Sequence, residues 1–429
     1  MGAEAKALLL DLFGAAVAAV RPEVCLAAHL PPPPQGRLIV LAAGKAAASM
    51  ATAALRHYRD AYGLNAAKLN GLVVTRPGYG LDTAPLPLIE AGHPVPDQAS
   101  LKASKMCLAL ARAARPDDLV LVLLSGGGSA LWTAPLEPLD LSGKQAVTRQ
   151  LLRSGATISE LNCVRKHLSS IKGGRLARAV YPAPLLTLAI SDVAGDDPSV
   201  IASGPTVPDP TRQQDALAIC RRHHVELPAE AEAVLADPKN ESAKPGEPCF
   251  AAARYSLVAT PAMALAAAGK IARERGYEVV ELGAALEGEA RDLARDHAAR
   301  ALAARRTGRP TLLISGGEVT VTLKGEGRGG PNQEFALALA IALHGADGIS
   351  GIACDTDGTD GGSGAATDPA GAVITPDTLS RAAALGLDPA AHLAEHDSGS
   401  FFAGLSDLVV PGPTFTNVND FRAILVSGR

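Results

Sequence analysis

Short apolar runs alternate with alanine-rich segments along most of this 429-residue chain, and this alternation constrains the fold more than any other feature. The apolar runs have the length of buried strands, whereas the alanine-rich segments have the length of helices. Strands that alternate with helices pair in parallel, because each helix returns the chain to the starting edge of the sheet. The sequence therefore predicts an α/β protein with a doubly wound sheet.

A polar segment rich in proline, at 226–248, interrupts the pattern as a domain junction does. Before it we expect strands at 37–43, 72–75, 118–124 and 184–190, and helices at 45–59, 101–114, 144–152 and 158–168. After it we expect strands at 255–259, 278–282, 311–315 and 349–353, and helices at 261–275, 287–305 and from 331 onward. We therefore predict two α/β domains, at 1–235 and 250–429.

Charge and cysteine content limit the classes of binding partner and the cellular compartment that we expect for the protein. With 40 Lys and Arg against 44 Asp and Glu, the chain lacks the basic excess of a nucleic-acid binder. The six cysteines are scattered singly, which fits a reducing cytoplasm. The apolar segment 8–20 contains Asp11 and is interpreted as a first amphipathic helix, since no apolar run reaches the roughly 18 residues that span a bilayer. We expect a cytoplasmic protein without nucleic-acid or membrane partners, and the number of subunits stays open, a homodimer included.

A glycine-rich turn, Ser125-Gly126-Gly127-Gly128-Ser129, follows the strand at 118–124. Consecutive glycines can expose backbone N–H groups, and a helix that begins there adds the positive end of its dipole. The functional interpretation is a phosphate site, and the structural alternative is a tight connection without a ligand. The strand at 311–315 ends similarly in Ser315-Gly316-Gly317, and the two Ser-Gly-Gly turns predict two halves of one cleft.

Two cations stand beside glycines. Lys45 follows Gly44 where a strand becomes a helix, so its ammonium group could meet a phosphate, a solvated helix lysine being the alternative. It is not part of a Walker A motif, because none of the Gly-Lys pairs at 44–45, 143–144 and 269–270 is followed by a hydroxyl residue. Arg328 lies in a glycine-rich segment, from where it could hold a carboxylate or phosphoryl group, a surface hairpin loop being the alternative.

Three acidic residues are candidates for metal or proton chemistry. Asp192 ends the strand at 184–190 beside a segment rich in hydroxyl groups and glycine, which suits Mg²⁺, while a turn-closing Asp is the alternative. Asp355 and Asp357 belong to a run of acids at alternate positions. That run is no EF-hand, because no Glu follows at the required distance, and a substrate or metal loop is the functional interpretation.

The chain as a whole resembles the class II glycerate 2-kinases of the MOFRL type, whose members are often labelled hydroxypyruvate reductases. The segments that carry the resemblance span nearly the whole chain, at 92–97, 124–131, 155–176, 190–196, 203–206, 315–318, 327–334, 355–361 and 416–420. The resemblance implies ATP-dependent phosphorylation of the 2-hydroxyl group of D-glycerate to 2-phosphoglycerate, with Mg²⁺. It also implies a cleft between an N-terminal Rossmann-like domain and a C-terminal MOFRL domain.

The resemblance places the family's active-site lysine on Lys45 and its active-site arginine on Arg328. We expect both to stabilise charge on the transferring phosphoryl group, while the backbone of 125–129 holds the phosphates of ATP. From charge type we add Asp192 as the base or a Mg²⁺ ligand, with Asp355 and Asp357 as alternatives. The substrate-binding candidates are Arg165 or Lys172 for the glycerate carboxylate, together with Asn332 and Glu334 in the matched segment 327–334.

Two departures and two alternatives accompany this hypothesis. Phe415 stands where the family has glycine, and the pattern His396-Asp397-Ser398-Gly399 also differs, so we expect a reshaped tail loop. The first alternative is an NAD(P)H-dependent hydroxypyruvate reductase, but the first domain lacks a glycine fingerprint, and the match at 325–330 is followed by Pro331. The second is a non-catalytic hydroxy-acid-binding protein, which the fold alone does not exclude.

Overall fold

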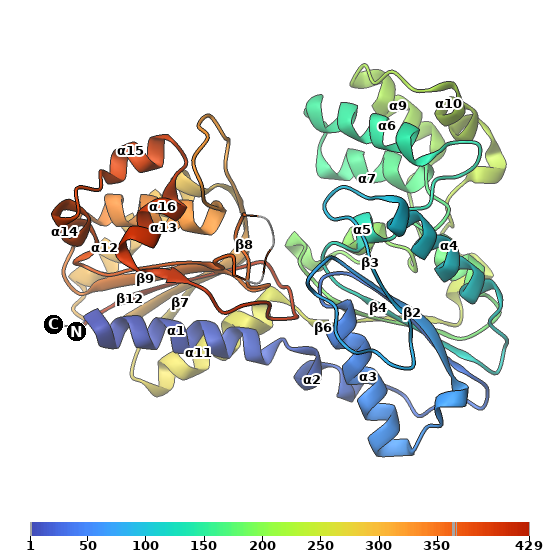
Figure 1. Ribbon diagram of the computed structural model, residues 1–429, viewed down its shortest axis with the longest axis horizontal. Helices are drawn as coiled ribbons and strands as arrows, with labels where there is room; N and C mark the ends of the chain where they lie inside the picture. Colours follow the sequence, from blue (N-terminus) through green and yellow to red (C-terminus); the bar gives the residue numbers. More distant parts are fainter. Residues whose placement is uncertain (1, 363–364, 366, 429) are drawn as a thin grey trace. The chain divides into compact units, whose positions relative to one another are not determined.

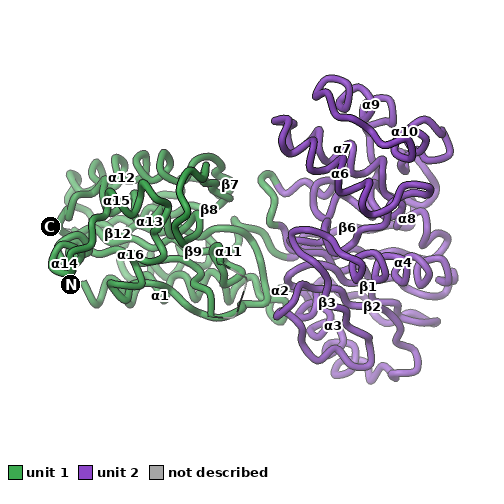
Figure 2. The backbone as a smooth tube through the Cα atoms, turned by 45° about the horizontal axis from the view of Figure 1, so that its top comes forward, with its two compact units in different colours: residues 1–25, 192–195, 259–429 green, residues 26–191, 196–258 purple. Residues whose placement is uncertain are grey.

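The computed structural model describes residues 2–362, 365 and 367–428, which form two compact units (Figure 2). Unit 1 comprises Met1–Cys25, Asp192–Gly195 and Ala259–Arg429, and unit 2 comprises Leu26–Ser191 and Asp196–Val258. The units are thus interleaved along the chain, whereas the sequence predicts the consecutive ranges 1–235 and 250–429. Among the described residues, no helix is both long and apolar enough to cross a membrane.

Unit 2 contains a six-stranded sheet with the order β3-β2-β1-β4-β5-β6. Its strands are β1 (Leu38–Ala43), β2 (Leu69–Thr75), β3 (Leu88–Glu90), β4 (Leu119–Leu124), β5 (Leu185–Ile190) and β6 (Ala253–Ala259). The pairs β3/β2, β2/β1, β1/β4 and β4/β5 are parallel. This is the strand order of a doubly wound sheet, so the predicted fold class is confirmed.

The buried strands of unit 2 explain why the sequence pattern is so clear. Every residue of β1 and β5 is buried, as expected for parallel strands covered on both faces. Helix α3 (Ala47–Tyr62) packs on one face and α4 (Gln98–Arg112) on the other (Figure 1). Ala43 of β1 lies opposite Leu124 of β4, so the segments that follow these two strands leave the sheet side by side.

A helical layer adds a second core to unit 2. The remaining helices of the unit are α5 (Gly128–Leu131), α6 (Leu141–Arg153), α7 (Ile158–His167), α8 (Arg175–Val180), α9 (Gln213–Arg222) and α10 (Ala229–Ala236). Val147 and Leu151 on one face of α6 pack with Leu161 and Val164 of α7 and with apolar residues of α9 and α10. The opposite face of α6 is therefore left to line a pocket.

Strand β6 corrects one expectation. The run at 255–259 is predicted to open the second domain, but β6 joins the first sheet beside β5. The polar segment before it contains helix α10 and two short 3₁₀ turns, at Pro238–Asn240 and Pro248–Phe250, and stays within unit 2. Proline-rich, polar composition therefore accompanies a segment that packs within unit 2 and does not mark the end of a compact unit.

Unit 1 contains a mixed sheet with the order β11-β10-β9-β12-β8-β7. Its strands are β7 (Glu278–Glu289), β8 (Thr311–Thr320), β9 (Ile349–Asp355), β10 (Gly371–Ile374), β11 (Leu408–Val409) and β12 (Asp420–Val426). Strands β7 and β8 are parallel, and the other pairs are antiparallel. The unit is α/β, as predicted.

Helices cover both faces of this second sheet (Figure 1). The helices of unit 1 are α1 (Gly2–Ala19), α2 (Pro22–Cys25), α11 (Pro261–Glu274), α12 (Ala290–Arg306), α13 (Pro331–Leu343), α14 (Thr378–Ala384), α15 (Pro389–Ala394) and α16 (Ser398–Leu405). Helices α1 and α11 lie on one face, and α12 and α13 lie on the other. Phe335, Phe401 and Phe402 are fully buried in the core of the second face.

The second predicted glycine turn is wrong. Strand β8 does not end at Ser315 but continues through Gly316 and Gly317 to Thr320, paired with β12. Gly317 has a φ of 114°, and a Cβ atom placed there would lie 2.1 Å from the main-chain oxygen of Leu286 in β7. The glycines therefore serve a close approach between irregularly paired strands, a second common use of glycine in strands.

Candidate active site

Lys45 and the glycine-rich turn lie side by side at the carboxyl edge of the first sheet. The Lys45 amide donates to the Gly126 carbonyl oxygen at 2.8 Å, and the Ala46 amide donates to Ser125 Oγ at 2.9 Å. A Cβ atom placed on Gly127 would lie 3.6 Å from Lys45 Cγ. Lys45 and the 125–129 backbone therefore lie together, as their predicted role with one phosphate group requires.

For binding an anion, the backbone amides of the turn matter more than the dipole of the helix that follows it. Helix α5, which starts at Gly128, has only four residues, so its dipole is weak. The amide of Ser125 donates to Ala43 and that of Gly128 to Ser125, whereas the amides of Gly126, Gly127 and Ser129 donate to no other described residue. Amides left in this way by a glycine-rich turn can bind an anion.

A pocket of about 410 Å³ in unit 2 opens beside this turn. One wall comes from the turn and from the segment 93–96, and another comes from α6. The α6 residues in the lining recur at a spacing of three or four, as one helix face does. The lining residues are His93, Pro94, Val95, Pro96, Gly127, Ser129, Ala130, Thr133, Leu141, Lys144, Gln145, Thr148, Arg149, Leu152, Arg165 and Lys172.

Both cations predicted for the glycerate carboxylate line this pocket. Lys172 is only 2% exposed, and its Nζ donates to the Ser129 carbonyl oxygen at 2.7 Å. Burial lowers the pKa of Lys172 well below its usual value, and the charges of Lys144 and Arg165 add to this effect. Burial also lowers the pKa of Arg165, in the last turn of α7, to about 10. The structure thus brings Arg165 and Lys172 together with Gly127 and Ser129.

Lys144 is the residue that sequence reasoning missed. It lies on the pocket face of α6 and is 6% exposed, and its Nζ has no hydrogen-bond partner among the described residues. Burial lowers its pKa to about 7, and the positive charges of Arg165 and Arg175 contribute. The available signal was its spacing from Leu141, Thr148 and Leu152, which places the lysine on one helix face with two leucines, opposite the core-facing Val147 and Leu151.

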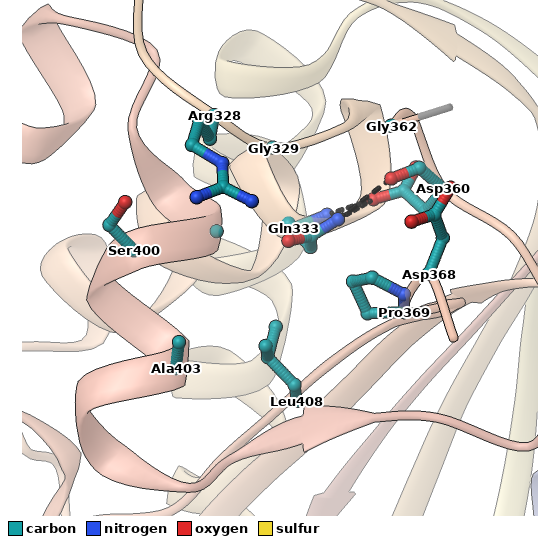
Figure 3. Close-up of a pocket in the computed structure, with 11 residues that line it drawn as sticks. Arg328, Gly329, Gln333, Asp360, Gly362, Asp368, Pro369, Ser400, Ala403 and Leu408 are labelled. Carbon is teal, nitrogen blue, oxygen red and sulfur yellow. Dashed lines mark hydrogen bonds between the residues drawn. The ribbon is translucent and has the colours of Figure 1, made fainter. Parts of the chain in front are cut away.

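Arg328 lies in unit 1, in the segment between β8 and α13. Its backbone is anchored, because its amide donates to Asp397 Oδ1 at 3.0 Å and its carbonyl accepts the Gly399 amide at 2.7 Å. Its side chain is exposed and points into a pocket of about 200 Å³ that Gln333 and Ser400 also line (Figure 3). No carboxylate among the described residues forms an ion pair with it, so the guanidinium can receive a ligand.

Asn332 and Glu334 follow on α13, and both side chains have partners inside unit 1. Asn332 Nδ2 donates to Asp420 Oδ1 at 2.6 Å and to Asp360 Oδ1 at 3.2 Å. Glu334 accepts from Arg291 Nε at 2.6 Å and lies 3.0 Å from His396 Nδ1. Their substrate-binding role stays a prediction, and their contacts are those of a buried network.

The same network contains an unusual acid. Asp360 accepts hydrogen bonds from the backbone amide of Asn332 and from the backbone and side-chain amides of Gln333. Figure 3 shows the bonds to Gln333. Burial nevertheless raises its pKa to about 7, and the charge of Asp420 contributes. Asp360 therefore holds the first turn of α13, next to the segment that carries Arg328.

Of the three candidate acids, Asp355 and Asp357 make contacts of the turn-closing kind, whereas Asp192 contacts a residue distant in sequence. The Asp192 carboxylate is half-buried and accepts from Asn417 Nδ2 at 3.1 Å. Asp355 accepts from the Asp357 amide at 2.8 Å, and Asp357 accepts from the Thr359 amide at 2.8 Å. Within 2–362, 365 and 367–428, no group of three or more His, Cys, Asp or Glu residues is placed to hold a metal ion. Their roles as metal ligands stay predictions.

Phe415 differs from the expectation drawn from the missing glycine. Its φ is 58°, in the left-handed region, so the phenylalanine takes the backbone conformation that we expected it to avoid. A bulky residue there costs about 1–2 kcal/mol. Hydrogen bonds on either side offset this cost, since Thr414 Oγ1 donates to Thr356 and Thr416 Oγ1 donates to Val20.

Comparison with known proteins identifies the family. Residues 8–236 match a family described as a domain of unknown function, DUF4147, and residues 311–420 match the MOFRL family. A crystal structure of glycerate kinase from Thermotoga maritima superposes with a TM-score of 0.88 and 36% identity, covering 99% of each chain. The chain belongs to the MOFRL-type glycerate 2-kinase family.

Curated relatives of this family carry two kinds of name. The D-glycerate 2-kinase of Thermotoga maritima is 38% identical over 97% of each chain, and human glycerate kinase is 38% identical over 78% of this chain and 72% of its own. A protein of Agrobacterium vitis with a provisional hydroxypyruvate reductase name is 50% identical, over 98% of this chain and 94% of its own.

Proposed function

We propose that this protein is a D-glycerate 2-kinase, which transfers the terminal phosphoryl group of ATP to the 2-hydroxyl group of D-glycerate. The products are 2-phosphoglycerate and ADP. The observation that carries the proposal is the agreement with the Thermotoga maritima glycerate kinase over 99% of both chains. The Thermotoga maritima relative named D-glycerate 2-kinase, at 38% identity, supports the position of the phosphorylated hydroxyl group.

The chemistry proposed for Lys45 and Arg328 is charge stabilisation. Phosphoryl transfer needs positioned positive charge on the phosphate oxygens more than it needs covalent catalysis. Lys45 stands beside Gly126 and Gly127, so its side chain and the N–H donors of the turn leave the same edge of the sheet. The guanidinium of Arg328 has no carboxylate partner among the described residues and is the second cation that we assign to the reaction.

We assign Asp192 the role of general base or Mg²⁺ ligand, with Asp355 and Asp357 as alternatives. Magnesium bound with a nucleotide neutralises phosphate oxygens, and it commonly takes only one or two carboxylates and keeps several waters. A cluster of three acids is therefore not required. Asn417 orients the Asp192 carboxylate through a 3.1 Å hydrogen bond, which suits either role. Activity that survives EDTA without added Mg²⁺ would contradict the metal role.

The reductase name of the Agrobacterium vitis relative makes hydroxypyruvate reduction the second candidate. A dinucleotide site of this fold needs several glycines after β1 and an acid near the end of β2 for the ribose. Here the turn after β1 contains the single Gly44, and β2 ends at Thr75, which Arg76 follows. We therefore prefer the kinase to both the reductase and a non-catalytic binding protein.

One assay separates these alternatives. The protein is incubated with D-glycerate, ATP and Mg²⁺, and the product is identified by ³¹P NMR, while a parallel sample receives hydroxypyruvate and NADH. We expect 2-phosphoglycerate in the first sample and no NADH oxidation in the second. Lys45→Met and Arg328→Met should each lower kcat by about 100-fold or more, and exposed Lys102→Met is the matched control. Full kcat in Lys45→Met would remove Lys45 from the mechanism.

A further inference from the structure

The pocket of unit 2 contains three cations for which the fold supplies no counterion. Lys144, Arg165 and Lys172 line it, and none of them forms an ion pair with a carboxylate among the described residues. The same unit also contains a buried lysine that is paired, since Lys166 lies 3.5 Å from Asp209 at comparable burial. Burying unpaired charge costs free energy, so the pocket is built at the expense of stability.

Lys144 makes this point most directly. Lysine carries three donors, and in Lys144 none of them meets an acceptor among the described residues. Lys172 differs, because its Nζ already donates to the Ser129 carbonyl oxygen, which also fixes the end of the glycine-rich turn. An anion that enters beside Gly127 and Ser129 would therefore find an unused ammonium group, a guanidinium and backbone amides together.

The rest of the pocket argues for a ligand with a large apolar part. Val95 and Leu152, at 64% and 62% exposure, present apolar surface at the lining of the pocket, with Pro94 and Pro96 beside Val95. A volume of about 410 Å³ falls in the range of pockets that bury drug-sized ligands. A short hydroxy acid brings one carboxylate and almost no apolar surface, whereas a nucleoside polyphosphate brings several charges and a flat base.

We propose that this pocket is the nucleotide site, with the phosphates against Lys144, Arg165 and Lys172 and the base against Val95 and Leu152. The proposal rests on the kinase function proposed above and deepens it. It reassigns Arg165 and Lys172 from the glycerate carboxylate to the nucleotide. It also adds Lys144 as a binding residue, and it connects the 125–129 turn to the same ligand.

The test measures binding of ADP and of inorganic pyrophosphate to the full chain by isothermal titration calorimetry. Lys144→Met should weaken both ligands about tenfold or more, since it removes a charged donor from the phosphates. Leu152→Ala should weaken ADP several-fold and leave pyrophosphate unchanged, because it touches only the base. Arg153→Met, an exposed cation on the same helix that does not line the pocket, is the control and should change neither.

Steady-state kinetics separate this proposal from the proposed function. We expect Lys144→Met to raise KM for ATP and to leave KM for D-glycerate within twofold. A rise confined to the KM for D-glycerate would overturn the nucleotide assignment and give the pocket to the acid, with the kinase intact. If Lys144→Met binds ADP more weakly but the wild type does not phosphorylate glycerate, the proposed kinase function is wrong and the assignment of the pocket to a nucleotide still holds. Unchanged ADP and pyrophosphate affinity, or no ADP binding by the wild type, would overturn the pocket.

Discussion

Two groups of buried and half-buried charged residues, one in each unit, differ in whether the fold supplies counterions. In unit 1 Arg422 lies 2.8 Å from Asp420 and Arg291 lies 2.6 Å from Glu334, so each charge has a counterion. In unit 2 Lys144, Arg165 and Lys172 share a pocket, and no described carboxylate pairs with them. A paired buried charge serves the fold, whereas a buried ammonium group with neither a counterion nor a hydrogen-bond partner among the described residues, as in Lys144, indicates a ligand.

The comparison predicts opposite signs for similar substitutions. Removing one member of a buried pair leaves the other charge without compensation, and this is strongly destabilising. Removing an unpaired buried cation relieves a desolvation cost, so the protein should gain stability and lose ligand affinity. A substitution of a cation in the pocket of unit 2 should therefore raise stability and lower ligand affinity. A substitution in the network of unit 1 should lower stability.

The largest effect is expected for Arg422→Met in unit 1. Arg422 is fully buried and donates to Asp420 Oδ2 and to the Gly316 carbonyl oxygen, both at 2.8 Å. Its loss leaves the Asp420 carboxylate buried without its cation, which costs about 3–5 kcal/mol. Guanidinium unfolding followed by circular dichroism measures the change. Arg300→Met, which breaks an exposed pair with Asp296, is the control and should cost less than about 0.5 kcal/mol.

Glu334→Gln should have the next largest effect. The amide keeps the shape but removes the negative charge that faces Arg291 and His396, at a cost of about 2 kcal/mol in the free energy of unfolding. Because these partners lie inside unit 1, we expect the KM for D-glycerate to stay within twofold, as measured at a temperature where the variant is folded. A tenfold higher KM with unchanged stability would instead support the substrate-binding role predicted from the sequence.

The sequence predicts those parts of the fold that depend on patterns of neighbouring residues. The aliphatic runs that form β1 and β4 are unambiguous, and parallel strands end at one edge of a sheet, so the proximity of Lys45 to the 125–129 turn follows from topology. Ser315-Gly316-Gly317 looks the same in sequence but lies within β8. Gly317 is required because the main chain of Leu286, on a neighbouring strand, approaches it closely, and no local sequence pattern reveals this contact.

The missing parts of the site depend on contacts between distant segments. Lys144 is recognised as a pocket residue only from the packing of α6. The apolar residues Val147 and Leu151 face the core, and this orientation places Lys144 in the same pocket as Arg165 and Lys172. Likewise, strand β6 shares its sequence signature with the strands that follow it, and only its pairing beside β5 assigns it to unit 2. Charge type and spacing suggest candidate residues, but they do not show whether a charged side chain has a counterion in the folded protein.

Lys144→Met should change stability in the opposite direction to the two substitutions in unit 1. Methionine fills a similar volume without a charge, so the unliganded protein should gain about 1 kcal/mol at pH 7. Guanidinium unfolding without nucleotide measures this gain. With saturating ADP the order should reverse, because the wild type gains binding free energy that the variant loses. A variant that is less stable than the wild type without ligand would show that Lys144 has a structural partner.

The most specific effect is the pH dependence of that gain. The pKa of Lys144 is about 7 in the folded protein and about 10.4 in the unfolded chain, so between these values the unfolded chain binds more protons. The wild type should therefore become more stable, through this group, as the pH rises from 7 toward 10, and should lose that contribution as the pH falls through 7. Lys144→Met lacks this dependence, while the other titrating groups are largely common to both proteins. The stability advantage of the variant should accordingly shrink between pH 7 and pH 9.5, and an advantage that stays constant would mean that the ammonium group is solvated or paired.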